Sequence, residues 1–387
     1  MNLRQIVIDL ITEIGGSIIS TINVKKSTWI FGAWKGQLYS DNSKYLFEYV
    51  LREHREINAV WITRNDDVYK KLQSEGLPVQ KRFSLKGLMT IAKAGVAFET
   101  EGNQDISPFM NKNTTVVQMW HGGVSPKRFR WEGFNSGRMG EHRRKSYWIT
   151  SSKQNSELLK EEFGLFDDHL IITGYPRNDV FTKMNESNQI IDLLEERAPG
   201  TKKIIYMPTH RGFGNKGGSF SIEELLVLDK QLCEANMIML FKPHFHELKN
   251  YLCFEERFSH IVFAKDQQLF GDVYSYIGGF DALVSDYSSI MYDYLCTKKP
   301  IIMFPFDYDA YQASEAGVYD FYLQNPVGPI CYTWSEVIKA LKQQFADGQE
   351  WMKNGEKARK LFHPYDDGKN CERVFKETMA LLEKKGR

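Results

Sequence analysis

The chain alternates short apolar runs with segments in which apolar residues recur every three or four positions. In the first half, the expected strands are 27–34, 57–65, 95–100, 114–121 and 146–152, and the expected helices are 43–54, 66–76 and 153–164. The strands are rich in β-branched and aromatic residues, and Ser43 is the expected N-cap of the first helix. Because the strands are apolar on both faces, the pattern predicts a parallel sheet covered by helices.

A second series of the same kind follows residues 198–203, which have the composition of a linker. Its expected strands are 203–209, 237–244, 260–265, 281–289 and 300–305, and its expected helices are 221–236, 273–280, 290–299, 334–348 and 370–385. The pattern therefore predicts an α/β protein with two Rossmann-like, doubly wound domains that face a central cleft. We expect the domains to span 1–180 and 181–365, with a final helix within 366–387 that is a candidate to cross back to the first domain.

Composition narrows the classes of function. Fifty basic and 49 acidic residues leave a formal net charge of +1, so no overall field favours nucleic acid, and we expect no nucleic-acid partner. The five cysteines are scattered without a CxxC pair, which favours a reducing, cytoplasmic setting and argues against a zinc site. The chain has no Walker loop, no GxGxxG after a strand and no GxSxG elbow, which argues against dinucleotide redox enzymes and serine hydrolases.

The first twenty residues form one apolar helical face without a membrane span. This face consists of Leu3, Val7, Leu10, Ile14 and Ile18. Charged residues interrupt it before it reaches the roughly 18 consecutive apolar residues that a transmembrane helix needs. Two alternatives stay open, which are a helix docked on the protein and a helix that lies in a membrane interface.

Polar side chains follow five of the expected strands. They lie in the segments His121–Gly123, Pro176–Asp179, Thr209–Gly212, Pro243–His244 and Ser285–Ser289. Ligands of doubly wound sheets bind just beyond the carboxyl ends of the strands. One polar strand end is ordinary turn chemistry, whereas five of them favour a common site.

Histidines stand at several of these strand ends. His121 precedes Gly122 and Gly123, which let backbone groups approach a ligand closely. We expect His121 to act as a general base, and the alternative is a histidine that only forms part of the cleft wall. His244 is a second candidate, with His246 as its rival.

Two further strand ends have the character of phosphate sites. Thr209 and Arg211 offer hydrogen-bond donors suited to a phosphate group. The turn Ser285–Ser289 can place two hydroxyls and the first N–H groups of a helix around an anion. The alternative is a plain N-cap by Ser288 or Ser289, and the two roles are compatible.

The segment 127–145 is locally basic. Its seven basic residues, against Glu132 and Glu141, are Lys127, Arg128, Arg130, Arg138, Arg143, Arg144 and Lys145. Most runs of this kind are solvated loops. Because this run follows His121 closely, it is also a candidate to receive an anionic acceptor or anionic lipid.

Several motifs of the chain resemble those of the CDP-glycerol glycerophosphotransferases of teichoic-acid and capsule synthesis. They are FGAWKGQLYSDNSKYLFEYV with AVWIT, QMWHGGVSPKRF, GYPRNDVF, YMPTHRG, FKPH and VSDYSSIMYDYLCTKKPIIMFPFD. These motifs cover most of the chain in the order of the family. The family's usual WHGTP is WHGGV here.

The resemblance implies a GT-B arrangement in which the second domain holds the donor and the first holds the acceptor. It implies transfer of glycerol phosphate from CDP-glycerol to a hydroxyl of a lipid-linked glycan or polymer, with release of CMP. It also implies a peripheral protein at the cytoplasmic face of the cell membrane. No cofactor is expected to be required; Asp307–Asp309 has the form of a metal-binding DxD, so a divalent metal stays an alternative.

The resemblance also carries roles onto individual residues. It implies that His121 is the base, that His244 is the second catalytic histidine, and that His210 stands where the family often has tryptophan. The donor-binding residues that we expect are Thr209, Arg211, Ser285, Asp286, Ser288, Ser289 and Asp293. The expected supporting residues are Gly122, Gly123, Arg177 and Asp179. The candidates for acceptor or lipid binding are Lys127, Arg128, Arg130, Arg143 and Arg144.

Three rival functions stay open. The first is transfer of ribitol phosphate from CDP-ribitol, and the second is sugar transfer from a nucleotide sugar on the same fold. The third is a non-catalytic, membrane-bound assembly subunit, in which the histidines at the strand ends would be dispensable. A panel of nucleotide-activated donors, with nucleotide release as the measurement, separates all three.

Overall fold

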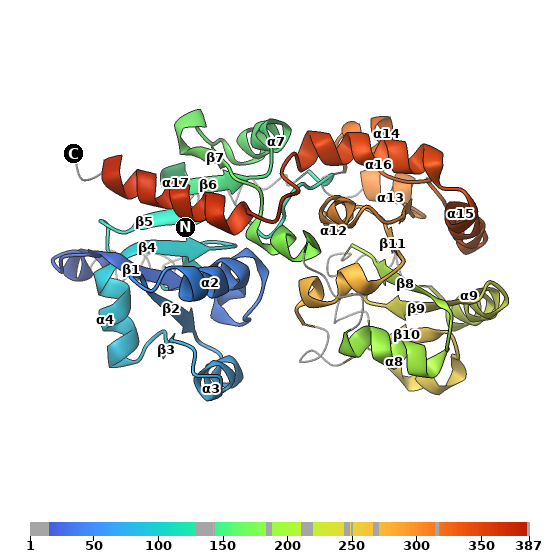
Figure 1. Cartoon of the computed structure of the whole chain (residues 1–387), viewed down its shortest axis with the longest axis horizontal. Coiled ribbons are helices and arrows are strands. Elements are labelled where there is room, and N and C mark those ends of the chain that lie inside the picture. Colours follow the sequence, from blue (N-terminus) through green and yellow to red (C-terminus); the bar gives the residue numbers. More distant parts are fainter. Residues whose placement is uncertain are drawn as a thin grey trace. The chain divides into compact units, whose positions relative to one another are not determined.

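The computed structural model describes residues 15–128, 142, 144–182, 188–209, 220–243, 248, 251–265, 271–313 and 317–384. The chain divides into two compact units (Figure 1). Unit 1 comprises 1–121, 131–179 and 369–387, and unit 2 comprises 122–130 and 180–368. The last helix of the chain therefore belongs to the same unit as its first strand.

Unit 1 is built on a seven-stranded parallel sheet with the order β3-β2-β1-β4-β5-β6-β7. The strands are β1 (Lys25–Phe31), β2 (Asn58–Thr63), β3 (Val79–Lys81), β4 (Ala94–Glu99), β5 (Thr115–Gln118), β6 (Tyr147–Thr150) and β7 (Leu170–Ile172). The helices are α2 (Asp41–Glu53), α3 (Asp66–Ser74), α4 (Leu85–Lys93), α7 (Lys153–Phe163) and α17 (Asn370–Lys384), and the 3-10 turns are η1 (Trp34–Gly36), η2 (Asn103–Asp105), η3 (Asp167–His169) and η4 (Pro176–Thr182).

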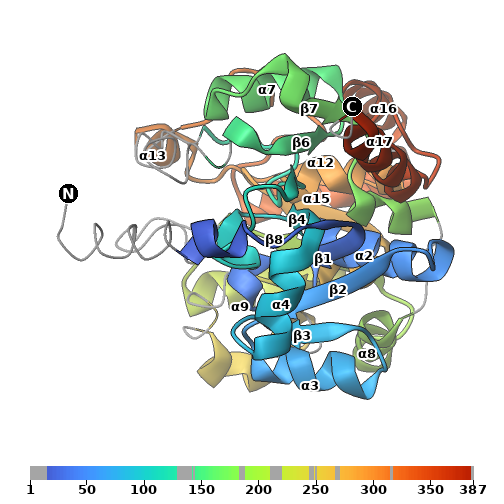
Figure 2. The ribbon, with the colours of Figure 1, turned by 90° about the vertical axis from the view of Figure 1, so that its left-hand side faces the viewer.

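Both faces of this sheet are covered. Along β1, Trp29 and Phe31 point into one core, where α2 and α17 pack side by side against the sheet (Figure 1). Ile30, between them, points to the opposite core with Ile91 of α4, which Figure 2 shows in front of the strands. The period-2 alternation of the strand thus places apolar side chains on both faces, as the doubly apolar sequence pattern predicts.

Unit 2 is built on a five-stranded parallel sheet with the order β10-β9-β8-β11-β12. The strands are β8 (Lys202–Met207), β9 (Met237–Phe241), β10 (Ile261–Phe263), β11 (Ala282–Ser285) and β12 (Ile301–Met303). The helices are α8 (Gln189–Arg197), α9 (Ile222–Glu234), α12 (Ile290–Tyr294), α13 (Tyr308–Ala313), α14 (Phe321–Gln324), α15 (Trp334–Ala346) and α16 (Gln349–Phe362), and the 3-10 turns are η5 (Leu252–Arg257), η6 (Val273–Ser275), η7 (Ile277–Gly279) and η8 (Leu295–Thr297). Helices α9 and α15 bury Leu228 and Leu341 with Tyr206 of the sheet.

Several details differ from the sequence predictions, and three of them follow. Ser43 is not an N-cap: it lies inside α2, and its hydroxyl donates to the carbonyl of Gly32 at 2.8 Å. The expected helix 273–280 is the pair of short 3-10 turns η6 and η7, because two glycines end the segment. Residues 122–130, expected in the first domain, belong to unit 2.

The reason for this last difference is backbone pairing within unit 2. Lys127 forms an antiparallel bridge with Val318, and the N–H of Tyr319 donates to the carbonyl of Pro126 at 2.8 Å. These bonds add the segment after His121 to the backbone of unit 2. The prediction from strand alternation alone had no signal for them, since they join residues about 190 positions apart.

Candidate functional site

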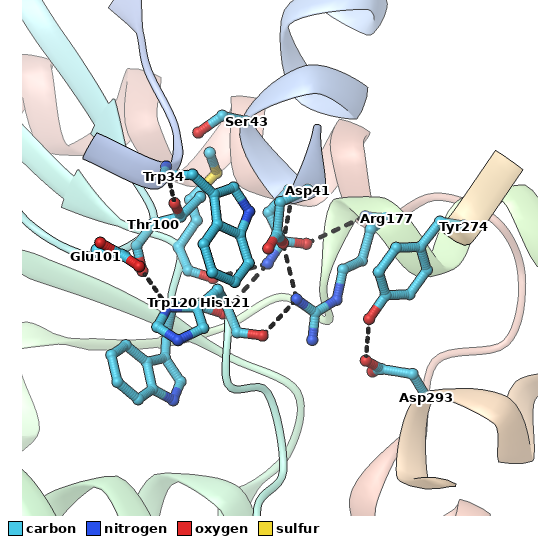
Figure 3. Close-up of polar contacts among 12 residues, drawn as sticks. Trp34, Asp41, Ser43, Thr100, Glu101, Trp120, His121, Arg177, Tyr274 and Asp293 are labelled. Carbon is cyan, nitrogen blue, oxygen red and sulfur yellow. Dashed lines mark hydrogen bonds and ion pairs between the residues drawn. The ribbon is translucent and has the colours of Figure 1, made fainter. Parts of the chain in front are cut away.

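His121 lies just beyond the carboxyl end of β5, as the strand pattern predicts. Its backbone N–H and its ring Nδ1 each form a hydrogen bond of 3.1 Å with the carbonyl oxygen of Thr100 (Figure 3). Since a carbonyl oxygen only accepts, Nδ1 carries the proton. The other ring nitrogen, Nε2, then presents a lone pair, which is the form that a general base needs.

Two tryptophan rings border the His121 ring. The Trp34 ring centroid is 4.9 Å away and that of Trp120 is 4.6 Å away. Desolvation lowers the pKa of His121 below its ordinary value of 6.5, while the negative charge of Asp41 acts in the opposite direction. A lowered pKa keeps the imidazole neutral near pH 7.

The turn that carries Thr100 is fixed by a buried carboxylate, Asp105. Its two oxygens accept backbone N–H groups from Lys35 at 2.6 Å, Thr100 at 2.6 Å and Glu101 at 2.8 Å. Burial raises the pKa of Asp105 to about 6, and these N–H donors act in the opposite direction. Asp105 therefore holds the carbonyl that orients the His121 ring, together with the turn at Lys35.

Arg177 supports the backbone of His121 from the other side. Its Nη1 donates to the carbonyl of His121 at 2.6 Å and to Oδ1 of Asp41 at 2.7 Å (Figure 3). Arg177 is 1% exposed and Asp41 is 5% exposed, so the ion pair is buried. Asp41 has φ +65°, a left-handed conformation that aspartate tolerates better than most residues.

The neighbouring residue Asp179 anchors the last helix. Its carboxylate accepts the backbone N–H groups of Asn370 and Cys371, each at 2.8 Å, at the start of α17. Gly174 has φ +78°, and a Cβ built there would lie 2.1 Å from Oδ1 of Asn370. The GYPRND segment thus joins β7, α2 and α17. The supporting role that we expect of Arg177 and Asp179 in the reaction stays a prediction.

Several residues around His121 were not identified from the sequence. They are Trp34, Asp41, Thr100 and Asp105. Trp34 and Asp41 lie within the FGAWKGQLYSDN motif, so the resemblance could have indicated them. Thr100 acts through its backbone carbonyl, and the Asp105 carboxylate acts on backbone N–H groups, for which the sequence has no comparable signal.

In unit 2, Asp286 joins the ends of two adjacent strands. Its Oδ1 accepts the N–H of Thr209, which follows β8, at 2.7 Å, and the N–H of Tyr287 at 2.6 Å. Its carbonyl accepts the hydroxyl of Tyr322 at 2.9 Å. Ser285, at the end of β11, donates its hydroxyl to the carbonyl of Met207. Both residues therefore stabilise the strand ends that the phosphate hypothesis requires.

Ser288 and Ser289 have a different environment. Ser289 is the N-cap residue of α12, but its side chain makes no capping hydrogen bond, so the plain-cap alternative is not supported. Both serines are half-buried, and neither hydroxyl bonds to another residue of the described part of unit 2. Because α12 has only five residues, the hydroxyls rather than a helix dipole are the relevant donors.

Asp293 is fully buried on α12. Its Oδ2 accepts the hydroxyl of Tyr274 at 2.6 Å (Figure 3), and its Oδ1 lies 3.9 Å from Nε2 of His363. These contacts hold α12 in place. The direct role of Asp293 in donor binding stays a prediction.

The remaining predicted residues fall into two groups. His244, Arg211, Arg130 and Arg143 lie outside the described residues. The others are Gly122, Gly123, Lys127, Arg128 and Arg144, which are described. Gly123 has φ +52°, a backbone that glycine adopts readily, and the Arg128 guanidinium lies 4.9 Å from the ring centre of Tyr319.

Metal binding has no candidate in the part of the chain that the structure describes. There, no group of three or more His, Cys, Asp and Glu side chains could hold an ion. Asp307, of the DYD tripeptide, accepts the hydroxyl of Tyr287 at 3.1 Å.

Known proteins resemble this chain in sequence and in structure. The teichoic acid glycerol-phosphate transferase of Staphylococcus aureus is 28% identical over 371 residues, covering 90% of this chain and 92% of that protein. The teichoic acid poly(glycerol phosphate) polymerase of Bacillus subtilis is 28% identical over 345 residues, and the match spans 84% of this chain but only 45% of that protein.

Solved structures agree on the fold. The wall teichoic acid polymerase TagF matches with a TM-score of 0.74 at 23% identity, over 99% of this chain and 96% of that structure. The two-sheet α/β, GT-B-like fold that we predict is therefore confirmed. The family model for CDP-glycerol:poly(glycerophosphate) glycerophosphotransferases matches residues 17–379, so the chain belongs to that family of transferases.

Proposed function

We propose that this protein transfers glycerol phosphate from CDP-glycerol to a hydroxyl of a lipid-linked glycan or polyol-phosphate polymer and releases CMP, in teichoic-acid or capsule synthesis. The observation that carries the proposal is the state of His121. Its Nδ1 is engaged by the Thr100 carbonyl, and its Nε2 has no hydrogen-bond partner among the described residues. A neutral imidazole held in this way can remove a proton from an acceptor hydroxyl.

The reaction then runs as one displacement. Nε2 of His121 takes the proton of the acceptor hydroxyl, and the oxygen attacks the phosphorus that bears glycerol. The bond from this phosphorus to the oxygen shared with CMP breaks, and CMP leaves with that oxygen. We assign stabilisation of the departing phosphate to the hydroxyls of Ser288 and Ser289, with Arg211 and His244 as further candidates.

The test measures CMP release by the purified protein from CDP-glycerol, CDP-ribitol and nucleotide sugars, with and without a lipid-linked acceptor. We expect release from CDP-glycerol, and a loss of about 100-fold or more in turnover for His121→Ala. His169→Ala is the matched control, because this histidine lies at the surface of unit 1 beside Asp168 and should leave turnover unchanged. Full activity of His121→Ala would refute the base assignment, and release from another donor alone would refute the substrate.

A membrane surface is the partner that a lipid-linked acceptor requires. None of the helices that are described is long and apolar enough to cross a bilayer. Residues 15–19 are helical, and Asn111 fixes their end by donating to the carbonyls of Ile19 and Ile22, while Ile18 is 65% exposed. This environment supports a helix whose end is docked on unit 1 and whose apolar face is open at Ile18.

Peripheral attachment at the cytoplasmic face is testable by co-sedimentation. We expect binding to anionic vesicles that weakens with salt, because surface charges are screened. Deletion of residues 1–14 should reduce binding without affecting the docked end of the helix. Protein that stays in the supernatant at low salt would exclude the attachment.

A further inference from the structure

Unit 2 contains a pocket at the amino end of β12, opposite to the end where the serine turn lies. It has a volume of about 420 Å³. Lys298, Lys299 and Pro300, which lead into β12, form one wall. Because Leu283 pairs with Ile301 and Ser285 with Met303 in parallel register, these wall residues and the Ser285–Ser289 turn lie at opposite ends of the two strands.

One rim of the pocket is positively charged. Lys298, Lys299, Lys353 and Arg359 line it, with Glu356 as the carboxylate among the lining residues. Lys298 and Arg359 share a single further carboxylate, that of Asp366, at 3.5 and 2.6 Å. Lys353 is exposed and makes no ion pair with another described residue. The rim is therefore complementary to an anion that carries more than one charge.

The interior of the pocket offers a buried amide. Gln344, on α15, is 7% exposed and lines the cavity. Its Nε2 has no hydrogen-bond partner among the described residues. A buried donor without an acceptor is unfavourable, so an acceptor atom brought by a ligand would be bound at this point.

The remaining walls are aliphatic. Leu295, Ile301, Val327 and Met352 contribute apolar side chains. Gly355, in the middle of α16, also lines the pocket, and a Cβ added there would lie 3.7 Å from Leu295 Cδ2. The helix therefore projects no side chain into the pocket at this position. Mostly apolar walls with a few polar groups are typical of small-molecule sites.

We propose that this pocket binds a nucleoside phosphate, with the base between the aliphatic walls, its polar edge on the Gln344 amide and its phosphates at Lys298 and Lys353. Other anions use fewer of these features. An alkyl phosphate would leave the Gln344 donor without an acceptor. A polyol phosphate would make few apolar contacts with the aliphatic walls, and free phosphate would contact only the charged rim. The volume is in the range of small-molecule sites, which is about 300–1,000 Å³.

This inference does not depend on the proposed transferase function. Any nucleotide that binds at the serine turn does so at the other end of the strands. Variants of the pocket should therefore remove one binding event and leave others unchanged.

The experiment is calorimetry on the full chain with CTP, UTP, ATP and GTP, and with inorganic phosphate as a separate probe. We expect Gln344→Leu to weaken binding of the preferred nucleotide by about tenfold or more, since it removes a buried donor. The pair Lys298→Gln with Lys353→Gln should weaken it by about tenfold at low salt and by less at high salt.

Matched controls lie beside each changed residue. Gln343→Leu replaces the exposed neighbour of Gln344 on α15, and Lys357→Gln replaces an exposed lysine of α16 that does not line the pocket. Both should bind as the unchanged protein does. If Gln344→Leu fails to fold, the lysine pair, which changes only charge at the rim, decides the question.

Two results would overturn the proposal. One is that no nucleotide responds to the pocket variants. The other is that inorganic phosphate binds as tightly as every nucleotide, because the base would then contribute nothing.

Discussion

The buried ion pair between Arg177 and Asp41 should dominate the stability of unit 1 around His121. In Arg177→Met, the methionine fills much of the arginine volume, but the Asp41 carboxylate loses its charged partner while 5% exposed. Breaking a buried pair in this way costs about 3–5 kcal/mol. The carbonyl of His121 also loses the Nη1 donor, which contributes about 1 kcal/mol of that loss.

The pH dependence of this loss identifies its cause. An unpaired buried carboxylate can take up a proton, which for an ordinary aspartate costs about 4 kcal/mol at pH 7 and about 1.5 kcal/mol at pH 5. The electrostatic part of the loss in folding free energy cannot exceed this cost of protonation, because the Asp41 carboxylate would otherwise become protonated. The variant should therefore regain about 2 kcal/mol of stability, relative to the unchanged protein, between pH 7 and pH 5. The lost hydrogen bond to the His121 carbonyl has no such dependence.

Urea unfolding followed by tryptophan fluorescence is a suitable assay, because six of the eight tryptophans lie in unit 1. Asp41→Asn combined with Arg177→Met should recover part of the loss at pH 7, since no charge is then left buried. The control is Arg52→Met, whose exposed pair with Glu53 should contribute under about 1 kcal/mol. A loss for Arg177→Met that is equal at both pH values would refute the electrostatic reasoning.

Four further predictions concern the proposed reaction and the residues that support it. The acid limb of kcat/KM should have its midpoint below pH 6.5, because desolvation lowers the pKa of His121 and the base acts in its neutral form above that pKa. Asp41→Asn should move this limb to lower pH, since the Asp41 charge raises the pKa; a pH–rate profile that moves upward contradicts this. Ser289→Ala should weaken CDP-glycerol binding by about 1–3 kcal/mol in calorimetry, and unchanged affinity would exclude the hydroxyl. Gly174→Ala should destabilise the protein more than Gly76→Ala in urea unfolding, because both have positive φ but only Gly174 would place its Cβ against another side chain; equal losses would show that the contact is irrelevant.

Much of the fold was predictable because its signals are local. The strands of both sheets are doubly apolar, and the helices between them have clear spacing and caps, such as Gly164 after α7, with φ +61°. The strand ends were predictable for the same reason, since in a parallel sheet every carboxyl end lies at one edge. His121 and the Ser285–Ser289 turn were identified as candidates in this way.

The parts that escaped prediction depend on contacts between distant segments. Asp179 accepts N–H groups from α17, which lies 191 residues further along the chain. Asp105 accepts the N–H of Lys35, 70 residues earlier. In both cases the donors are backbone groups, which every residue type except proline provides. No pattern of side chains can therefore indicate which carboxylate will receive them.

Burial now separates two kinds of polar residue at the strand ends. Asp286 and Arg177 are almost fully buried, and their hydrogen bonds to backbone groups fix neighbouring segments. His121 and Ser289 are only half-buried, and each keeps a polar group that no described residue engages. A reacting group must be reachable, whereas a group that fixes its position must be immobile. Asp286 and Ser289 stand in the same turn, so a motif that the sequence presents as one unit contains both a residue that fixes the backbone and a residue whose hydroxyl no described residue engages.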